Sequence, residues 1–386
     1  MGRMATLECR TAGESHGQAL IALIEGLPAG VPLDMQVVDR ELLRRQGGYG
    51  RGGRQKIEKD VANLLSGVRR GRTIGSPVAL QLVNKDWRID EAPEVTRPRP
   101  GHADLAGSLK WLTTDCRETL ERASARETAA RVAAGALAKS ILTPFGIRCV
   151  AFVTRIGEAQ ASVGAERSAD DLIAARDANE VYTPDASAIG SMMAAILRAK
   201  QDKDTIGGIV EARVFGCPPG LGSCGRYQDK LDGRLMQAVG SIQAIKGVEI
   251  GLGFATAGLF GSHVHDEIGF DPGLRGWPSL GFTRRSNNAG GIEGGMTNGQ
   301  TVIVRAAMKP ISTLLQGMDS VDLKTKAPQR SDYERSDVCA VPAASVVVEN
   351  VVAFEMARAF LEKFGGDTLA EVKAAYEFYM DAARKL

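Results

Sequence analysis

The stretch "ERASARETAARVAAGALAK", residues 121–139, predicts a helix that can pack closely against its neighbours, because most of its side chains are small. Ser124 is followed three residues later by Glu127, which is the capping-box pattern, so we expect the helix to begin at Ser124. The free amides of its first turn face Arg122, and a helix N-terminus beside an arginine suits a phosphate. The alternative is that Arg122 only pairs with surface acids.

Predicted helices and strands alternate on both sides of this segment. The segment 33–48 predicts a helix that runs from an N-cap at Asp34 to a glycine stop at Gly47. Amphipathic spacing predicts further helices over residues 230–242 and 343–366, and Thr368 opens a final helix with Glu371 as its capping-box partner. Apolar, β-rich runs predict strands over residues 5–11, 18–27, 76–84, 207–215, 247–260 and 300–308. The chain contains no low-complexity linker, charge block or repeat, so we expect one α+β domain over residues 1–386.

Composition limits the kind of partner. The 386 residues are 44% hydrophobic, and 48 Lys and Arg against 46 Asp and Glu give a net charge of +2, whereas nucleic-acid-binding proteins usually carry a basic excess over a whole face. No uncharged apolar run approaches the roughly 20 residues needed to span a bilayer, and the start lacks a signal-peptide core. The six cysteines are scattered without CxxC spacing. We therefore expect a soluble, cytoplasmic protein that binds neither nucleic acid nor membrane.

An arginine-rich loop follows the first predicted helix. The segment "RRQGGYGRGGRQ", residues 44–55, places Arg44, Arg45, Arg51 and Arg54 among glycines and one tyrosine. Such runs also occur in RNA-binding tails, so the loop alone is ambiguous between nucleic acid and a small polyanionic ligand.

Histidines are few, and two of the four lie in polar loops. His16 in "GESHG" and His102 in "RPRPGHADL" can serve as acids or bases near neutral pH, or can simply be surface residues. "GESHG" also matches a hydrolase nucleophile elbow, but a β-like segment follows Ser15 where an elbow needs a helix. His263 and His265 alternate as two ligands on one strand face would, yet no third ligand is evident, so we predict no metal.

Glycine-rich turns supply further donors near the C-terminal third. "NNAGGIEGGMTNGQ" and "MKPIST" flank a predicted strand and let backbone approach a flat ring or a phosphate. "ERSDVCAVPAAS" places Arg335 and Asp337 on either side of Ser336. Many anion donors, two histidines and an isolated carboxylate together suit lyase chemistry on a phosphorylated acid.

At these motifs the sequence resembles the chorismate synthase family, in order and over nearly the whole chain. The resemblance differs at "GLGSCGRYQDKLDG", residues 220–233, where the family more often has a turn containing Glu-Pro. The seven matching segments are "GESHGQAL", "RRQGGYGRGGRQKIEKD", "RPGHADL", "RASARETAARVAAGALAK", "SNNAGGIEGGMTNGQ", "MKPIST" and "ERSDVCAVPAA".

The resemblance implies a fold and a reaction. The fold is a β-α-β sandwich with a central helical layer between antiparallel sheets, assembled as a homotetramer. The enzyme is a carbon–oxygen lyase of the shikimate pathway, which removes phosphate from 5-enolpyruvylshikimate-3-phosphate by 1,4-anti elimination to give chorismate. Reduced FMN is required, with no net redox change. NADPH as reductant, from this chain or through a separate flavin reductase, is left open.

The resemblance also implies site residues. His16 is the expected proton donor to phosphate, His102 protonates or charge-balances the flavin, and Asp337 helps flavin N5 take up the ring proton. Substrate contacts fall on Ser15, His16, Arg45, Arg51, Arg54, Arg99, Arg126 and Arg335. FMN contacts fall on Arg122, Ala123, Ser124, Gln243, Ala244, Gly294, Lys309, Pro310, Ile311, Ser312, Thr313 and Arg335.

Two questions stay open at this level. Arg45 and Arg51 also match positions assigned to NADPH, but one loop cannot easily hold both ligands at once, so we favour substrate there. Two rival classes are an FMN-dependent oxidoreductase acting on a phosphorylated or carboxylated small molecule, which would change its substrate's oxidation level, and an RNA-binding module, whose affinity would fall steeply with salt.

Overall fold

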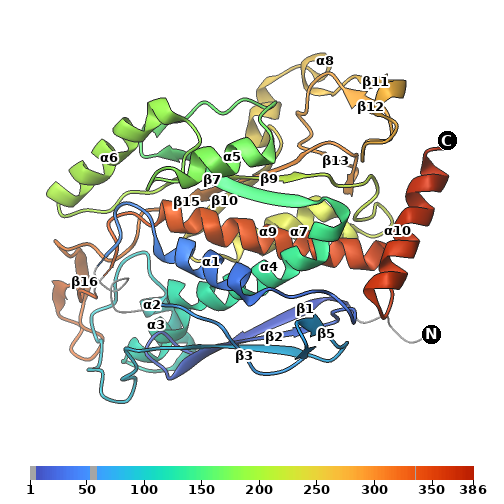
Figure 1. Ribbon diagram of the computed structural model, residues 1–386. Coiled ribbons are helices and arrows are strands. Elements are labelled where there is room, and N and C mark those ends of the chain that lie inside the picture. Colours follow the sequence, from blue (N-terminus) through green and yellow to red (C-terminus); the bar gives the residue numbers. More distant parts are fainter. Residues whose placement is uncertain (1–5, 53–58, 335) are drawn as a thin grey trace.

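Two antiparallel sheets enclose a layer of helices in the computed structural model, which describes residues 6–52, 59–334 and 336–386 (Figure 1). One continuous apolar core holds buried residues from both sheets and from the helices between them. The predictions of an α+β class and of a helical layer between antiparallel sheets are therefore confirmed.

The first sheet has the strand order β1-β2-β6-β3. Its strands are β1 (Glu8–Ala12), β2 (Ala19–Glu25), β6 (Val78–Val83) and β3 (Asn63–Leu64). Every second residue of β2 is buried, and Leu20, Ala22 and Ile24 belong to the core that also contains the alanines of the central helices. This period of two is the pattern of a sheet that buries one face.

The second sheet has the strand order β10-β15-β9-β7-β8 and is buried on both faces near its middle. Its strands are β10 (Ile245–Ile250), β15 (Val302–Met308), β9 (Gly208–Phe215), β7 (Arg148–Ile156) and β8 (Ala159–Gln160). Five consecutive residues of β7 are buried, because Val150 and Phe152 pack under helix α5 (Ala169–Asp177) while Ala151 and Val153 face the main core. Helix α6 (Ile189–Gln201) lies on the same outer side (Figure 1).

The helices that lie between the two sheets are labelled in Figure 1. They are α1 (Met35–Gln46), α4 (Thr128–Leu142), α7 (Leu231–Gly240) and α9 (Val341–Lys363). Helix α4 contacts β2 and β6 of the first sheet, and α9 contacts β7 and β9 of the second. The two helices pack against each other at Gly135, where an added Cβ would lie 2.1 Å from the carbonyl oxygen of Asn350. The alanine-rich sequence permits this close approach, as predicted.

The central helix does not begin where its sequence predicted. Ser124 ends α3 (Arg117–Ala123) and caps a 3-10 turn, Ala125–Glu127, so α4 starts only at Thr128. The hydroxyl of Ser124 accepts from the Arg126 amide, while the Glu127 carboxylate accepts from Thr11 and Gln243 and closes no capping box. Tertiary partners of Glu127 thus replace the local interaction. The capping box at Thr368 and Glu371 is confirmed at the start of α10 (Leu369–Ala383).

The predicted strand over residues 247–260 is wrong in its second half. Strand β10 ends at Ile250, and left-handed glycines at Gly251 (φ 60°) and Gly253 (φ 55°) turn the chain into a 3-10 helix, Gly253–Gly258. The turn at 220–233 contains a 3-10 segment, Tyr227–Asp229, and leads directly into α7.

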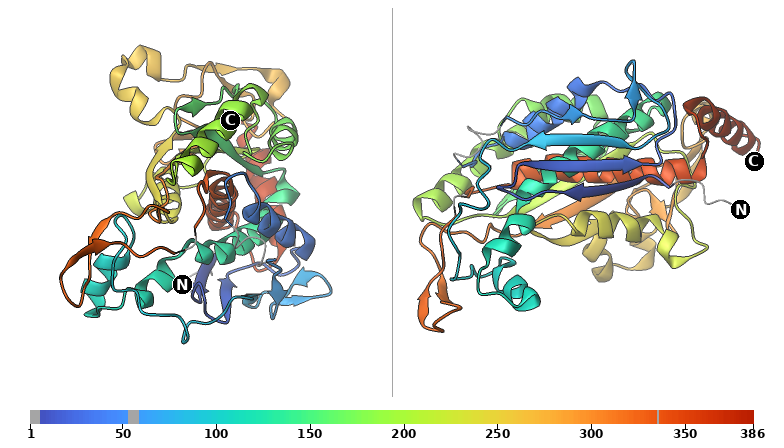
Figure 2. Two further views of the ribbon diagram at one scale, coloured as in Figure 1. Left: turned by 90° about the vertical axis from the view of Figure 1, so that its left-hand side faces the viewer. Right: turned by 90° about the horizontal axis from the view of Figure 1, so that it is seen from below.

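An exposed arm, residues 252–284, projects from the second sheet (Figure 2). No residue between 252 and 279 is buried, although the arm is rich in large apolar side chains. Those exposed along it are Phe254, Leu259, Phe260, Ile268, Phe270, Trp277 and Phe282. It is built from α8 (Gly261–Val264), β11 (Ile268–Phe270) and β12 (Phe282–Arg284).

Short elements complete the described chain. They are the strand pairs β4 (Val68–Arg69) with β5 (Arg72–Thr73), β13 (Ile292–Glu293) with β14 (Met296–Thr297) and β16 (Asp319–Val321) with β17 (Pro328–Arg330), and the helix α2 (Asp104–Trp111). All six cysteines are unpaired. Within the described ranges, no helix combines the length and apolar character needed to cross a bilayer.

Candidate active site

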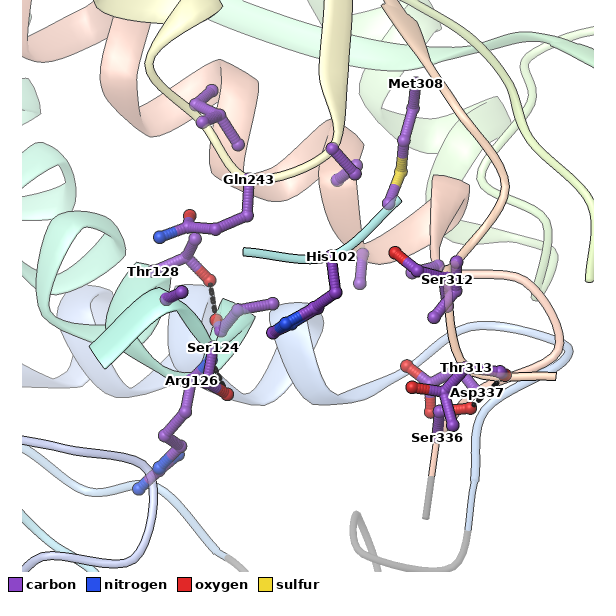
Figure 3. A pocket seen from close by; sticks show the side chains of 18 of the residues that line it. His102, Ser124, Arg126, Thr128, Gln243, Met308, Ser312, Thr313, Ser336 and Asp337 are labelled. Atoms are coloured by element: carbon purple, nitrogen blue, oxygen red, sulfur yellow. Dashed lines mark hydrogen bonds between the residues drawn. The ribbon is translucent and has the colours of Figure 1, made fainter. Parts of the chain in front are cut away.

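A cavity of about 730 Å³ collects most of the residues that the sequence singled out (Figure 3). Its wall is made by the β1–β2 loop, the end of α1, the loop before α2, the α3–α4 junction, the start of β10 and the segments around 308–313 and 336–344. The predicted residues that line it are Ser15, His16, Arg45, Arg51, Arg99, His102, Ala123, Ser124, Arg126, Gln243, Ala244, Lys309, Ile311, Ser312, Thr313 and Asp337.

Five predicted residues are not among those that line the cavity. Arg54 and Arg335 lie outside the described residues. Gly294 lies in the β13–β14 turn with a φ of 60°, and neither it nor Pro310 lines the wall. Arg122 lines an adjoining cavity of about 470 Å³ that shares Gln243 with the first. Their ligand assignments stay predictions.

Arg122 has a structural task in the described chain. Its guanidinium donates to the carbonyl oxygens of Gly13 and Thr11 and to the Thr11 hydroxyl, at 2.9–3.1 Å. These bonds hold the end of β1 and the loop after it. The loop needs its first glycine, because Gly13 has a φ of 102° and an added Cβ would lie 2.2 Å from the Ala19 carbonyl oxygen.

His16 is fixed by Glu121 of α3. The Glu121 carboxylate contacts His16 Nδ1 at 2.9 Å and accepts from the His16 backbone amide at 2.7 Å. Burial alone would raise the pKa of Glu121, but the hydrogen bonds from His16 and Arg117 lower it below the ordinary value. Beside this pair, the Ser124 hydroxyl donates to the Ser15 hydroxyl at 3.1 Å. In the described chain, Ser15 thus contacts Ser124 and the His16 ring contacts Glu121, and the two residues do not pair as nucleophile and base.

His102 has a similar carboxylate partner, Asp104 at the start of α2. Asp104 is fully buried and accepts from the Arg99 backbone amide and Nε at 3.0 and 2.8 Å, and it also bonds to His102 Nδ1. Burial would raise the pKa of Asp104, but the bonds to His102 and Arg99 hold it well below its usual range. Arg99 also donates to Thr313 at 3.0 Å, which ties this loop to the 308–313 segment.

Two buried arginines share one carboxylate on the cavity floor. Arg126 Nη1 lies 2.7 Å from both oxygens of Asp60, and its Nε donates to Asn84 at 2.8 Å. Arg45 lies 3.6 Å from Asp60 and donates to Thr128 at 2.9 Å. Burial, together with the nearby cations Arg126 and Arg51, lowers the pKa of Arg45 to about 10 despite its attraction to Asp60. Two cations on one carboxylate leave an excess positive charge, which favours an anionic ligand.

Asp337 lies on the opposite wall from Gln243 and Thr128 (Figure 3). Its carboxylate accepts from Arg51 Nη1 at 2.5 Å and from the Gly52 amide at 2.6 Å. Next to it, the Ser336 hydroxyl donates to the Thr313 carbonyl oxygen at 3.0 Å. Lys309 completes this wall, and burial and the nearby Lys246 lower its pKa.

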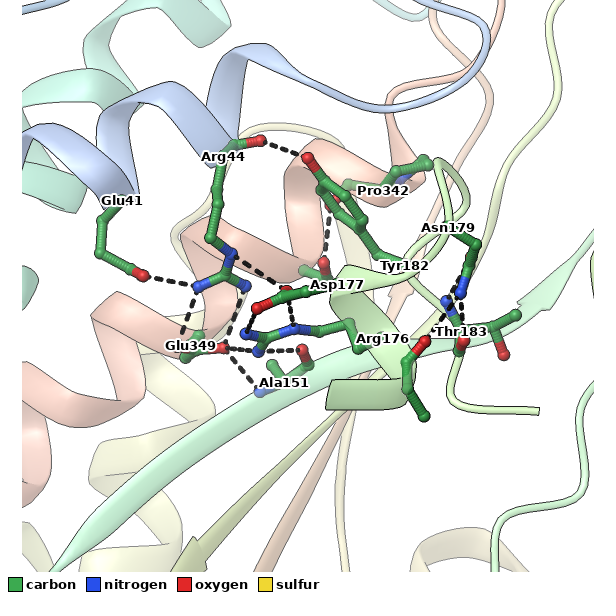
Figure 4. A network of polar contacts seen from close by, with 12 residues as sticks. Glu41, Arg44, Ala151, Arg176, Asp177, Asn179, Tyr182, Thr183, Pro342 and Glu349 are labelled. Carbon is green, nitrogen blue, oxygen red and sulfur yellow. Dashed lines mark hydrogen bonds and ion pairs between the residues drawn. The ribbon is translucent and has the colours of Figure 1, made fainter. Parts of the chain in front are cut away.

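A buried ion network, defined here as Glu41, Arg44, Lys139, Arg176 and Glu349, fixes the helix end that carries Arg45. Figure 4 shows Glu41, Arg44, Arg176 and Glu349 of this network. Glu349 of α9 accepts from Lys139 at 2.6 Å, from Arg176 at 2.7 Å and from the Ala151 amide at 2.8 Å. Arg44 donates to Glu41 at 2.6 Å and to Glu349 at 3.3 Å. The network therefore joins α1, α4, α5, β7 and α9 directly behind the cavity wall.

Acid should weaken this network. Burial alone would raise the pKa values of Glu41 and Glu349, but the neighbouring cations lower both below their ordinary value of 4.5. A lowered folded-state pKa adds stability that is fully present above pH 4.5 and is lost as the pH falls through the folded-state value.

We expect Glu349→Gln to lower the unfolding free energy at pH 7 by about 3–5 kcal/mol and to flatten the decline of that free energy below pH 4.5, measured by urea unfolding. The exposed Glu377→Gln is the control, and parallel pH curves for wild type and Glu349→Gln would contradict the assignment.

The structure provides no support for a metal site at the two remaining histidines. His263 lies in the short helix α8 and His265 follows it, so they do not share a strand face as their spacing suggested. Across residues 6–52, 59–334 and 336–386, no three His, Cys, Asp or Glu side chains are grouped to hold a metal ion.

Comparisons with known proteins show which family this chain belongs to. The chorismate synthase family model matches residues 7–361. Chorismate synthases of Geobacter sulfurreducens and Desulforamulus reducens are 54% and 51% identical to this chain, each over 97% of it and over 98% and 99% of their own lengths. A crystal structure of a chorismate synthase superposes with a TM-score of 0.80 at 41% identity and covers 99% of both chains. The chain therefore belongs to the chorismate synthase family, and it is a lyase.

Proposed function

We propose that this chain converts 5-enolpyruvylshikimate-3-phosphate to chorismate by 1,4-anti elimination, with reduced FMN bound and without net redox change. In this reaction the C–O bond to phosphate breaks, a ring carbon loses a proton and a ring double bond forms, so the oxidation level is unchanged. The observation that carries the proposal is a single cavity in which an excess of buried arginine charge lies with two carboxylate-paired histidines.

The arginines fit the substrate's charges. The ligand carries one phosphate and two carboxylates, and arginine forks suit such oxyanions. Arg126 has a buried Nη2 without a hydrogen-bond partner among the described residues, and the same holds for Nε of Arg51. Both nitrogens are donors that an oxyanion can satisfy. We assign Arg45, Arg51, Arg99 and Arg126 to substrate, with Ser15 beside them, and the burial of Arg45 favours substrate over NADPH at this position.

The cavity also fits a flavin. Its size is in the range of small-molecule sites, and Ala123, Ala343, Ala344, Val347 and Met308 give it apolar wall that a flat ring needs. Gln243 Oε1 is buried without a partner in the described chain, so it can accept from a ring N–H. We assign FMN to Ala123, Ser124, Gln243, Ala244, Lys309, Ile311, Ser312 and Thr313. When bound, reduced FMN supplies electron density to the positive charge that develops as phosphate leaves.

The acid–base groups then follow from position. His16 is the group we assign to protonate the departing phosphate, since its Nδ1 is held by Glu121. We assign His102 to protonate the flavin or balance its charge, and Asp337 to assist the flavin in taking up the proton lost from the ring. The arginines that hold phosphate also stabilise the charge that develops on it.

The exposed arm supports assembly as a homotetramer. A two-stranded ribbon such as β11–β12 is marginal alone, and its apolar side chains Ile268, Phe270 and Phe282 remain 42–68% exposed. Sedimentation equilibrium of the full chain tests this assembly through a mass four times 41.0 kDa.

An anaerobic assay tests the function. Prereduced FMN, protein and 5-enolpyruvylshikimate-3-phosphate should yield chorismate and phosphate in equal amounts, followed by ultraviolet absorbance and by phosphate determination. Chorismate without equal phosphate, or no chorismate, would overturn the proposal. Repeating the assay from oxidised FMN with NADPH added, and without it, shows whether the chain reduces its own flavin or needs a separate reductase.

A further inference from the structure

Both active-site histidines use the same ring nitrogen for a buried carboxylate. Nδ1 of His16 faces Glu121 and Nδ1 of His102 faces Asp104, and the two carboxylate side chains are 1% and 0% exposed. In the described chain, neither histidine has a hydrogen bond through Nε2. Each ring therefore keeps Nε2 for the cavity that it lines.

The Glu121 carboxylate decides which nitrogen of His16 carries a proton. Hydrogen bonds lower the pKa of Glu121, so the group is an ionised acceptor at neutral pH. A carboxylate can only accept, so Nδ1 of His16 must be the donor across their 2.9 Å contact. The second oxygen accepts the His16 backbone amide, so the ring and its own backbone are held by one side chain.

Glu121 is itself held in place from its other side. Arg117, one turn earlier on α3, donates to Glu121 at 3.4 Å and to Glu334 at 2.9 Å. Among the described residues, the charged groups joined to the pair by hydrogen bonds are Arg117 and, through it, Glu334. This arrangement leaves the carboxylate little freedom to turn away from the histidine.

Asp104 repeats the arrangement with an arginine on the same loop. Arg99 donates three times to Asp104, at 2.8–3.0 Å, and Asp104 bonds to His102 Nδ1. Arg99 Nη2 also lies 3.0 Å from that Nδ1. Since the ionised Asp104 carboxylate can only accept, Nδ1 of His102 is the donor in their contact, and the Arg99 guanidinium donates to the same carboxylate.

We propose that Glu121 and Asp104 are positioning residues, which fix the Nδ1–H form of His16 and His102 and so present Nε2 for proton exchange with the bound ligands. The catalytic part of this role rests on the proposed function, whereas the geometry of the two histidine rings does not depend on that function. A buried carboxylate on Nδ1 also stabilises the doubly protonated ring that a proton donor requires.

Glu121→Gln tests the role of the first pair. The amide keeps the size of the side chain but removes the charge and offers a donor to Nδ1. We expect kcat to fall by about 10- to 10³-fold with KM for substrate and the affinity for FMN changed by less than about 3-fold. The matched control is Glu118→Gln, on the same helix with its side chain exposed, which should leave kcat unchanged.

A second readout is independent of turnover. With four histidines in the chain, selective ¹⁵N labelling gives resolvable ring signals, and His16→Ala assigns one of them. In ligand-free protein, Glu121→Gln should shift His16 away from the Nδ1–H form, and Asp104→Asn should do the same for His102 alone. An unchanged ring signal together with unchanged kcat would overturn the proposal, and so would equal losses of kcat and FMN affinity.

Folding defects are separated by a milder variant. If Glu121→Gln does not fold, Glu121→Asp keeps the charge and withdraws the carboxylate by one methylene, and it should lower kcat and shift the His16 signal. No change in either would overturn the proposal. A wild-type chain that makes no chorismate, but whose His16 signal still shifts in the variant, would overturn the proposed function and leave the ring geometry standing.

Discussion

His16→Ala should lower turnover of 5-enolpyruvylshikimate-3-phosphate by about 10²- to 10⁴-fold, the usual contribution of a general acid. Phosphate leaves as an oxyanion, and the group that protonates it must be correctly placed before the C–O bond breaks. The ring of His16 is only 12% exposed and is fixed by Glu121, so water cannot easily take over its position. His102→Ala should cause a loss of similar size because of the role beside the flavin that we propose for it.

The measurement is kcat with prereduced FMN, together with titrations of FMN and substrate. Both ligands should still bind, since the arginines and the apolar wall remain. His265→Ala, an exposed histidine on the arm, should leave turnover unchanged. Unchanged turnover in His16→Ala or in His102→Ala would remove that residue from the mechanism.

Oxidised FMN should support no turnover at all, whereas prereduced FMN should support many product molecules per flavin. The reason is that the elimination leaves substrate and product at the same oxidation level, so the flavin is not consumed. His16, His102 and Asp337, which we propose as the acid–base groups of such a reaction, all line the cavity.

An anaerobic experiment without external reductant decides this point. Protein loaded with prereduced FMN receives excess substrate, and chorismate and the flavin spectrum are followed together. The flavin should end reduced. A plateau at one product per FMN, with oxidised flavin at the end, would identify the oxidoreductase alternative instead.

Much of the fold could be predicted from local sequence. The helix of residues 35–46 begins after Asp34 and ends at Gly47 as its cap residues predict, and the capping box at Thr368 opens the last helix. Local signals failed where a tertiary contact decided the outcome. Glu127 is used by Thr11 and Gln243 across the molecule, and the left-handed glycines after Ile250 end a strand that apolar composition alone would continue.

The cavity was less predictable than the fold. Its arginines and histidines stand in recognisable motifs, whereas Asp60 and Glu121 stand only at the ends of quoted segments and Asn84 at the end of a predicted strand, and none of the three has a predicted role, although each directly holds a predicted residue. Their partners lie 42 to 105 positions away in sequence. Asp104 could have been predicted more easily as a partner of His102, because it follows His102 by two positions within the same quoted motif. A carboxylate near a loop histidine is a signal that a sequence reading can use.

The buried ion network around Glu349 affects how a ligand is captured. Helix α1 places Arg44 in that network and the next residue, Arg45, in the cavity. Ordering a long side chain on binding costs about 0.5–1.5 kcal/mol. Arg45 is already ordered by folding, so this entropic loss does not reduce affinity. The same rigidity makes the helix end selective. An anion whose charged groups do not match the fixed position of the Arg45 guanidinium gains no affinity from it.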